Sequence, residues 1–408
     1  MRAIVISTVV AVAFAAAAGA RAEPSLPEEV QEALESWLAE RAPVEKATGI
    51  AAYVSLGDPG PAIEAFAGKV GRAPNDATVS QDTLFQMGST SKSFAAAVIL
   101  KLEATGKLSL EDTVGRWLPE YPAWKDVPIR HLLNMSSGIP NYSETEAMSR
   151  TWAEEPNRTL SAQDLVKLAY PSVTNKLAPT TGYHYSNTNY ILAGMIAAKA
   201  AGKPYRDLVH ELLLKPLGLN STFYEDGPYP AEVITRLAHG YFENPACTDY
   251  QPKECKVSWN QPILGRDMRT ASTTWAQAAG GAISNARDLD RWMRAVFAGR
   301  VVPPKQQAEW QSLISLKTGA PIRDVSATDP AGFSLGLARA MHGLAGPLWF
   351  YEGVTLGYRT LYVWYSDENM MITLQTNSQP PEGTDKIGDA IAAVHDILKA
   401  DPPKKASP

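Results

Sequence analysis

The sequence predicts an α/β protein in which both ends of the chain form one lobe and a mostly helical lobe is inserted between them. Three observations lead to this prediction. A helical stretch and two strand-like runs lie near the N-terminus, strand-like runs and a helix close the chain, and the residues between them contain helical stretches separated by long Pro, Asn and Thr loops. We expect an α/β lobe at 23–108 and 271–402, a helical lobe at 109–270 and a tail at 403–408.

The N-terminal elements follow from spacing and turn residues. "PEEVQEALESWLAERA" (27–42) repeats apolar residues at helical spacing, begins with a proline and has acids in its first turn, which predicts a helix. "GIAAYVSLGD" and "AIEAFAGKV" predict two strands joined by a Gly/Pro turn. "TSKSFAAAVILKLEATGKL" predicts a long helix that is buried on most faces and ends at Gly106.

The middle of the chain is predicted to be mostly helical, and the C-terminal part to contain strands followed by a helix. "SAQDLVKLAY" and "NYILAGMIAAKAAGK" predict helices, and Ser161 with Asp164 has the pattern of a capping box. "SNARDLDRWMRAVFAG" (284–299) predicts an amphipathic helix. "FSLGLARA", "LWFYEG" and "YRTLYVWYSDENMMITLQTN" predict strands, the last with a hairpin turn at 366–369, and "DKIGDAIAAVHDILKA" predicts a closing helix.

The first 22 residues have the pattern of a secretory signal peptide. Arg2 precedes an uncharged run from Ala3 to Ala20, and Ala20-Arg21-Ala22 is an A-x-A-like cleavage pattern. The alternative is an N-terminal membrane anchor, but the apolar run is short for a span and no second hydrophobic segment follows. We therefore expect cleavage near Ala22, a periplasmic or secreted protein, and no stable membrane anchor.

The two cysteines, Cys247 and Cys255, lie eight positions apart in a polar loop. In an exported protein such a pair predicts one local disulfide. A metal site is the weaker alternative, because no histidine has ligand spacing around the pair.

The composition excludes some classes of partner. The formal net charge of −5 is unsuited to nonspecific binding of nucleic acid or anionic lipid. The six histidines are scattered and form no HExxH-like cluster. We expect a small-molecule substrate, no nucleic-acid partner, no metal or other cofactor, and a monomer.

Ser89 and Lys92 in "FQMGSTSKSFAA" (85–96) are the first candidate catalytic residues. They are three positions apart at the start of the predicted helix, so both side chains lie on one face of its first turn. The helix dipole favours an anion at Ser89, and a buried lysine with a lowered pKa can accept the hydroxyl proton. A helix-capping serine beside a surface lysine would have the same spacing.

The second candidate element is "YHYSNTNY", in a loop before an apolar helix. Tyr185 and Asn187 are two positions apart, so in an extended segment both side chains lie on the same side. A phenol suits proton relay and an amide suits holding a substrate carbonyl or amide. The alternative is a helix cap with surface tyrosines.

Taken together, "FQMGSTSKSF", "IRHLLNMSSGI" and "YSNTNYILAG" resemble the serine β-lactamase and penicillin-binding-protein superfamily. The branch with class C β-lactamases, low-molecular-weight D,D-peptidases and family VIII esterases is the most similar, and "AGGAISNARDLDRW" matches its later helix. The resemblance covers roughly residues 45–400. It implies a β-lactamase/transpeptidase-like fold, with an antiparallel sheet flanked by N- and C-terminal helices and an inserted, mostly helical lobe. It also implies Ser89 as acylated nucleophile, Lys92 and Tyr185 as the proton-handling pair, and Asn187 as a substrate-contacting amide.

The family's third motif has two candidate positions. Lys317-Thr318-Gly319 has the family's letters, but Tyr351-Glu352-Gly353 directly precedes the last hairpin, where the motif belongs in the family. We therefore expect Tyr351 and Gly353 to line the site. The resemblance then implies an oxyanion hole made by the N–H groups of Ser89 and Val354.

Tyr351 departs from the family, whose members usually have lysine, histidine or tryptophan there. A tyrosine offers a substrate carboxylate only a neutral hydroxyl. Arg359 is a candidate to take over if it turns inward, and a solvated strand residue if it does not. "GFSLG" (332–336) has the letters of a nucleophile elbow, but the segment after Ser334 is strand-like where that elbow needs a helix.

The leading functional hypothesis is a serine hydrolase that forms an acyl-enzyme on Ser89, as a β-lactamase acting on β-lactam antibiotics. One alternative is a carboxylesterase or a D,D- or D-amino-acid peptidase of the same fold, which the missing third-motif lysine favours. Another is a penicillin-binding sensor that is acylated without turnover.

Overall fold

The computed structural model describes residues 24–172, 182–245 and 261–400. The predicted signal peptide and the predicted Cys247–Cys255 disulfide lie outside these residues. A nine-stranded sheet, antiparallel throughout, forms the centre of the described chain in the order β2-β1-β12-β11-β10-β9-β8-β6-β7. Its strands are β1 (Gly49–Leu56), β2 (Ala62–Gly68), β6 (Leu313–Ser315), β7 (Pro321–Ile322), β8 (Ala331–Phe333), β9 (Ala338–His342), β10 (Gly346–Val354), β11 (Arg359–Tyr365) and β12 (Met370–Thr376).

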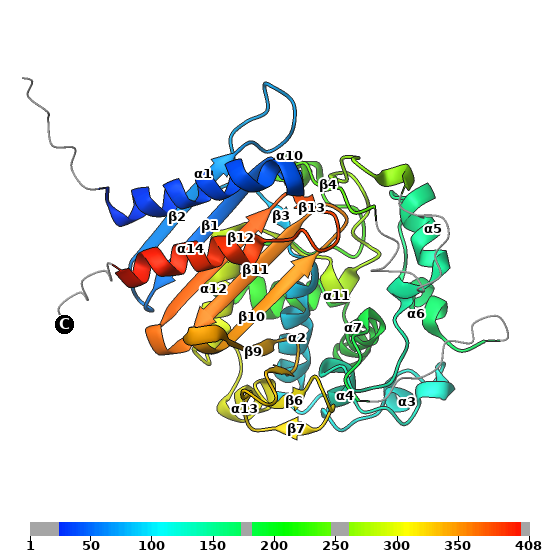
Figure 1. The fold of residues 1–408 in the computed structure, drawn as a ribbon. Helices are drawn as coiled ribbons and strands as arrows, with labels where there is room; N and C mark the ends of the chain where they lie inside the picture. The colour runs from blue at the N-terminus through cyan, green and yellow to red at the C-terminus, as the bar shows by residue number, and fades with distance from the viewer. Residues whose placement is uncertain (1–23, 173–181, 246–260, 401–408) are drawn as a thin grey trace, which may run out of the picture.

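Helices cover both faces of this sheet (Figure 1). On one face, α1 (Leu26–Glu45) and α14 (Ile387–Ala400) lie side by side and pack against β1, β2, β11 and β12. On the other face lie α12 (Ala286–Phe297) and α2 (Lys92–Ala104). Alternation along the strands divides the core, because successive side chains point to opposite faces. Ile50, Ala52 and Val54 pack under α1 and α14.

The helices between residues 109 and 230 form the inserted part, on the far side of α2 (Figure 1). They are α3 (Val114–Trp117), α4 (Ile129–Leu133), α5 (Glu146–Glu154), α6 (Ala162–Ala169), α7 (Asn187–Ala201), α8 (Tyr205–Val209) and α9 (Lys215–Leu217). Three further helices follow this part: α10 (Ala231–Arg236), α11 (Gln277–Gly280) and α13 (Pro304–Trp310). Short pairs β3–β5 (Phe85–Gln86 with Ile283–Ser284) and β4–β13 (Tyr241–Phe242 with Ser378–Gln379) join the two parts of the molecule. None of the described helices has the length and hydropathy of a membrane span.

The predicted α/β arrangement is confirmed. The two N-terminal strands, the long helix at 92–104, the Ser161–Asp164 capping box and the β11–β12 hairpin form as predicted. Gly106 follows the long helix in the left-handed region (φ 72°) and ends it, and Asn369 takes the same region (φ 50°) in the hairpin turn. The ends and turns of these elements contain residues, such as Gly106 and Asn369, that favour the backbone conformation found there.

Two segments differ from the prediction. The run "FSLGLARA" is not one strand, because a turn from Ser334 to Leu337 with Gly336 at φ 79° separates β8 from β9. The segment 231–242, expected in the helical lobe, packs against the sheet side instead. Leu84 N donates to Arg236 O (2.9 Å), and Leu237 belongs to the same apolar cluster as Phe85 and Tyr358. The position of this short helix is determined by the burial of its apolar side chains against the sheet, which its local sequence does not predict.

Candidate active site

Ser89 lies in a tight turn between strand β3 and helix α2. β3 pairs with β5, and Met87 N donates to Ala282 O (2.8 Å), which fixes the strand that leads into the turn. Gly88 adopts φ 52°, a conformation that side chains disfavour, and starts the 3₁₀ turn Gly88–Ser91. Ser89 is therefore half-buried at the N-terminal end of α2, as predicted.

Lys92 is fully buried, and its amine has three close oxygens. Nζ lies 2.9 Å from Ser89 Oγ, 2.8 Å from Asn187 Oδ1 and 2.6 Å from Ala279 O. Burial lowers the pKa of Lys92 well below its usual value, so the neutral amine is favoured. The amide and carbonyl oxygens can only accept, so a neutral amine donates its two hydrogens to them and turns its lone pair toward the Ser89 hydroxyl. This is the arrangement of a general base.

Tyr185 closes the other side of Ser89. Its hydroxyl lies 2.5 Å from Ser89 Oγ, and Lys92 Nζ is 4.8 Å from the centre of its ring. Burial raises the pKa of Tyr185 to about 12, although the contacts with Ser89 and Tyr351 lower it. Tyr185 is therefore a neutral phenol at physiological pH, able to donate and accept a proton but not present as a phenolate.

Asn187 connects Lys92 to the mouth of the cleft. While its Oδ1 accepts from Lys92, its Nδ2 donates to Ser143 Oγ (3.1 Å). Ser143 Oγ in turn donates to Asn141 Oδ1 (2.9 Å), and Asn141 Nδ2 donates to the exposed carboxylate of Glu144 (3.1 Å). Asn187 thus holds the amine of Lys92 and also lines the cavity around Ser89, where we expect it to contact substrate.

Strand β10 forms the wall opposite α2. Tyr351 faces the cleft and is buried; its hydroxyl lies next to that of Tyr185, and burial raises the pKa of Tyr351 well above the usual value. A Cβ at Gly353 would lie 1.9 Å from Met87 O and 2.8 Å from Ser89 N. A Cβ at Gly88 would lie 2.6 Å from Val354 N. The strand and the serine turn therefore touch backbone to backbone, and only glycine allows this at either position.

The register of β10 directs the N–H of Val354 away from β11 and toward the side of the strand where Ser89 lies. Thr355 N donates to Tyr358 O (3.0 Å) across the β10–β11 turn. Hydrogen-bonded and non-hydrogen-bonded pairs alternate in antiparallel strands, so the next pair, Val354 with Arg359, is non-hydrogen-bonded and the N–H of Val354 points away from β11. Pairing with β9 ends at Phe350, which leaves that side of the strand open beside Ser89.

These residues surround a cavity of about 310 Å³. Sequence reasoning missed the residues on its remaining walls, among them Trp275, Glu144 and Ser143. The described lining contains two acidic residues and no lysine, arginine or histidine. Of the two acids, Glu352 directs its side chain to the opposite face of the sheet by strand alternation, which leaves Glu144 as the charge at the mouth. The lining residues are Gly88, Ser89, Asn141, Ser143, Glu144, Tyr183, Tyr185, Asn187, Trp275, Ala276, Ala279, Gly280, Tyr351, Glu352 and Val354.

Three other residues considered in the sequence lie outside this cavity. Arg359 is neither solvated nor turned toward the cleft: it is fully buried on the α1/α14 face and pairs with Glu45 (2.7 Å). Lys317 is exposed in the β6–β7 turn at the sheet edge and does not line the cavity, whereas Tyr351 on β10 does. Ser334 is buried between β8 and β9 and is followed by a strand.

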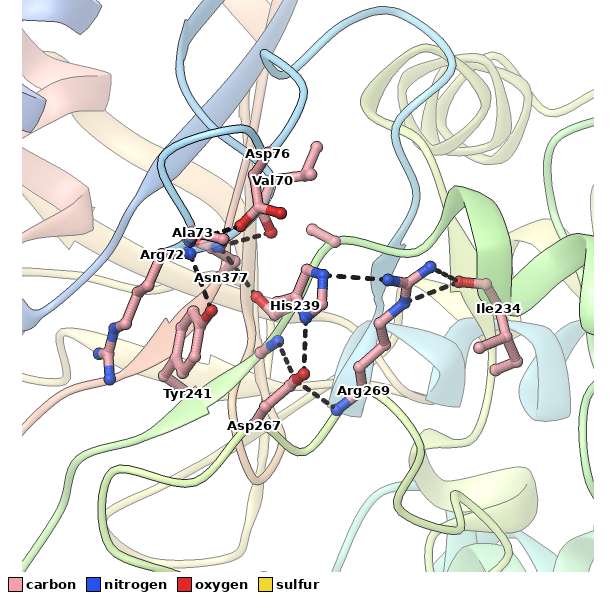
Figure 2. Close-up of polar contacts among 12 residues, drawn as sticks. Val70, Arg72, Ala73, Asp76, Ile234, His239, Tyr241, Asp267, Arg269 and Asn377 are labelled. Atoms are coloured by element: carbon pink, nitrogen blue, oxygen red, sulfur yellow. Dashed lines mark hydrogen bonds and ion pairs between the residues drawn. The ribbon is translucent and has the colours of Figure 1, made fainter.

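A second polar cluster contains the Asp–His pair His239 and Asp267 (Figure 2). His239 Nδ1 lies 2.6 Å from Asp267 Oδ2, and His239 Nε2 lies 3.0 Å from Arg269 Nη1. An arginine can only donate, so Nε2 is the acceptor and neither ring nitrogen is left for substrate. Asn377 Nδ2 also donates to His239 O (2.9 Å). The cluster is structural: it fixes the chain next to Gly240, which packs against Tyr358 of the β10–β11 turn.

Most of the chain is similar in sequence to known proteins. The protein-family model described as Beta-lactamase matches residues 41–396. Penicillin-binding protein 4* of Bacillus subtilis (strain 168) is 28% identical over 323 residues, which cover 79% of this chain and 66% of that protein. Esterase EstB of Burkholderia gladioli is 33% identical over 151 residues, covering 34% and 38%. The chain thus spans less than two thirds of the length of either relative.

Solved structures extend the similarity to nearly the whole chain. A D-stereospecific amidohydrolase from Streptomyces sp. has a TM-score of 0.71 at 25% identity, covering 90% of this chain and 97% of that one. A D-amino acid amidase from Ochrobactrum anthropi SV3, complexed with L-phenylalanine amide, has a TM-score of 0.72 at 24% identity, covering 92% and 99%. The predicted fold class is confirmed.

Proposed function

Because the chain belongs to the β-lactamase family, whose members matched here are hydrolytic enzymes, we propose that it hydrolyses amides or esters through an acyl-enzyme on Ser89. The observation that carries the proposal is the position of the buried Lys92 amine, 2.9 Å from Ser89 Oγ with its other directions taken by acceptor oxygens.

This geometry supports acylation of Ser89. Lys92 takes the proton of the Ser89 hydroxyl as Oγ attacks the substrate carbonyl carbon and the carbonyl electron pair moves onto oxygen. The N–H groups of Ser89 and Val354 stabilise that oxyanion. When the tetrahedral intermediate collapses, the bond to the leaving nitrogen or oxygen breaks, and the leaving group takes the proton through Tyr185. Lys92 then deprotonates a water molecule, whose oxygen bonds to the acyl carbon. The acyl–Oγ bond breaks, and Lys92 returns the proton to Ser89 Oγ.

The charge at the mouth supports a particular substrate class. Glu144 is an exposed carboxylate, and the described lining offers no cation to a substrate carboxylate. A protonated amino group would pair with Glu144, while Tyr183, Tyr351 and Trp275 give the cavity aromatic walls. We therefore place amides, esters and short peptides of amino acids with a free α-amino group first. The D-stereospecific amidohydrolase similarity favours the D-enantiomers.

β-Lactam hydrolysis, the leading hypothesis from the sequence, becomes the second candidate. The family match favours it. Against it stands Tyr351, which gives the carboxylate of a β-lactam no positive charge. We also propose that the protein is exported after cleavage near Ala22, in keeping with the pattern of residues 1–22.

One experiment tests the reaction and the substrate class together. We expect turnover of D-phenylalanine amide with a kcat/KM at least about tenfold above that for a cephalosporin, and an acyl adduct on Ser89 by mass spectrometry of the intact protein. Glu144→Gln should raise KM for the amide by about tenfold and leave a neutral activated ester unchanged. An adduct without turnover would indicate the sensor alternative; labelling that persists in Ser89→Ala would refute the assignment of the nucleophile.

A further inference from the structure

A second cavity lies on the opposite face of the sheet from Ser89. It has a volume of about 350 Å³ and lies between α14 and strands β9, β10 and β11; we call it the α14 cavity. Helices α1 and α14 cover β1, β2, β12 and β11, whereas β9 and β10 extend beyond α14 (Figure 1). Its walls are apolar and include Leu348, Phe350, Leu361, Val363, Ile387 and Ile391.

Helix α14 contributes a glycine to the rim of the α14 cavity. Gly388 lines the cavity and is itself exposed, and a Cβ built there would meet nothing within 4 Å. A glycine in the first turn of a helix costs stability relative to alanine, and no close approach of backbone requires it at this position. Beside this glycine, the α14 cavity is an apolar volume that the protein itself does not fill.

One end of the α14 cavity is acidic. Glu352, on β10, and Asp385, just before α14, both line it. The carboxyl group of Glu352 hydrogen-bonds with that of Asp385, while its Oε1 is buried and has no further hydrogen-bond partner in the described part of the chain. Nearby Arg359 cannot serve it as a full partner, because its guanidinium pairs with Asp385 and Glu45 and donates to Ser378 O (2.9 Å).

The charges around Glu352 do not balance when it is ionised. Three carboxylates, Glu45, Glu352 and Asp385, then face two cations, Arg359 from β11 and Arg41 from α1, which pairs with Glu45 at 2.8 Å. His342 on β9 and Tyr365 on β11 complete the titratable groups of the lining. Burial, and next the charge of Asp385, raise the pKa of Glu352 to about 8. A proton shared between Glu352 and Asp385 therefore replaces the third cation.

We propose that the α14 cavity binds a small apolar molecule with a primary ammonium group, which lies between the carboxylates of Glu352 and Asp385. The ammonium donates to Glu352 Oε1 and replaces the proton, while the apolar body covers the strand and helix side chains. A ligand with a carboxylate head would meet three acids, and a neutral alcohol would leave Glu352 protonated. This site is independent of the chemistry at Ser89, from which strand β10 separates it.

Hexylamine, compared with 1-hexanol, tests the proposal on the full-length protein. We expect hexylamine to bind at least about tenfold more tightly than 1-hexanol in calorimetry at pH 9, because a charged hydrogen bond replaces a neutral one. Binding should weaken by about tenfold or more at pH 6.5, where the ligand must displace the proton from Glu352. Equal affinity for the amine and the alcohol, or no pH dependence, would overturn the proposal.

Two variants locate the binding. Gly388→Leu should fill the cavity and abolish hexylamine binding, while Ala393→Leu, on an exposed position of the same helix, should leave it unchanged. Glu352→Gln should remove the pH dependence and the preference for the amine. Hexylamine binding that survives Gly388→Leu lies elsewhere, for example at Glu144, and contradicts the proposal. Because Gly388→Leu introduces a better helix former into open space, loss of the fold is not expected to obscure this result.

Discussion

Lys92 Nζ and Ser89 Oγ lie 2.9 Å apart in the structure, with the amine buried and the hydroxyl reachable from the cleft. The two groups differ in exposure: the proposed base, Lys92, is shielded from water, while the proposed nucleophile, Ser89, is not. Burial favours the neutral form of the amine, as the proposed role of Lys92 as base requires, and the cleft leaves the hydroxyl accessible to a substrate.

Replacing Lys92 by arginine tests this relationship. Arginine keeps a cation and its donors but cannot lose a proton, so it cannot accept one from Ser89. We expect Lys92→Arg to lower kcat by at least about 10²-fold, measured on the activated ester. The wild-type protein should also lose kcat/KM toward acidic pH, because Lys92 is inactive once protonated and its lowered pKa defines that limb. An arginine variant with nearly full activity would exclude Lys92 as the base.

Gly353→Ala should damage both stability and activity. The added methyl group would lie 1.9 Å from Met87 O, so the strand or the serine turn must move. We expect a loss of about 1–3 kcal/mol in the free energy of unfolding, measured in urea, and little acylation of Ser89. Gly388→Ala is the matched control, since its methyl group enters open space and should not destabilise the protein. Normal acylation in Gly353→Ala would contradict the contact.

Tyr351→Lys should change the substrate preference. A lysine on β10 would give a substrate carboxylate the cation that the cleft lacks, a gain of about 1–3 kcal/mol if the pair is desolvated. We expect a lower KM for anionic β-lactams and little change for a neutral ester. Lys317→Ala, in the exposed β6–β7 turn, is the control and should leave both activities intact. If Lys317→Ala instead abolished β-lactam turnover, the third motif would have been assigned to the wrong segment.

The disulfide remains a prediction from the sequence. Cys247 and Cys255 should react with a thiol reagent only after reduction, and loop closure over so short a segment should contribute roughly 2–3 kcal/mol. Two free thiols in the unfolded, unreduced chain would refute it. Because the pair is remote in sequence from the site motifs, activity should largely persist after reduction.

The sequence alone predicted the candidate site residues that lie within one short motif. Ser89 and Lys92 are neighbours on one turn, and Tyr185 with Asn187 lies at the start of one helix, so local spacing already places each pair. That the two pairs meet, with Tyr185 2.5 Å from Ser89, needed the resemblance to a known family, because the contact spans 96 positions.

Other residues were missed for identifiable reasons. Glu144 and Ser143 lie in a loop, and no periodicity connects them to Asn187. Arg359 could have been placed by alternation, because it shares the strand face of Leu361 and Val363, which pack under α1 and α14. Its partner Glu45 is more than 300 positions away, and nothing in the local sequence pairs them.

The backbone contact between Gly88 and Gly353 also limits how this protein could acquire new substrates. Since neither position tolerates a side chain, the corner of the cleft next to the reacting carbonyl is invariant to mutation in a working enzyme. Adaptation must act at the outer walls, where Glu144 and Trp275 carry side chains that can be exchanged without moving Ser89. A directed-evolution library restricted to the outer walls would therefore sample altered selectivity with a largely preserved reaction rate.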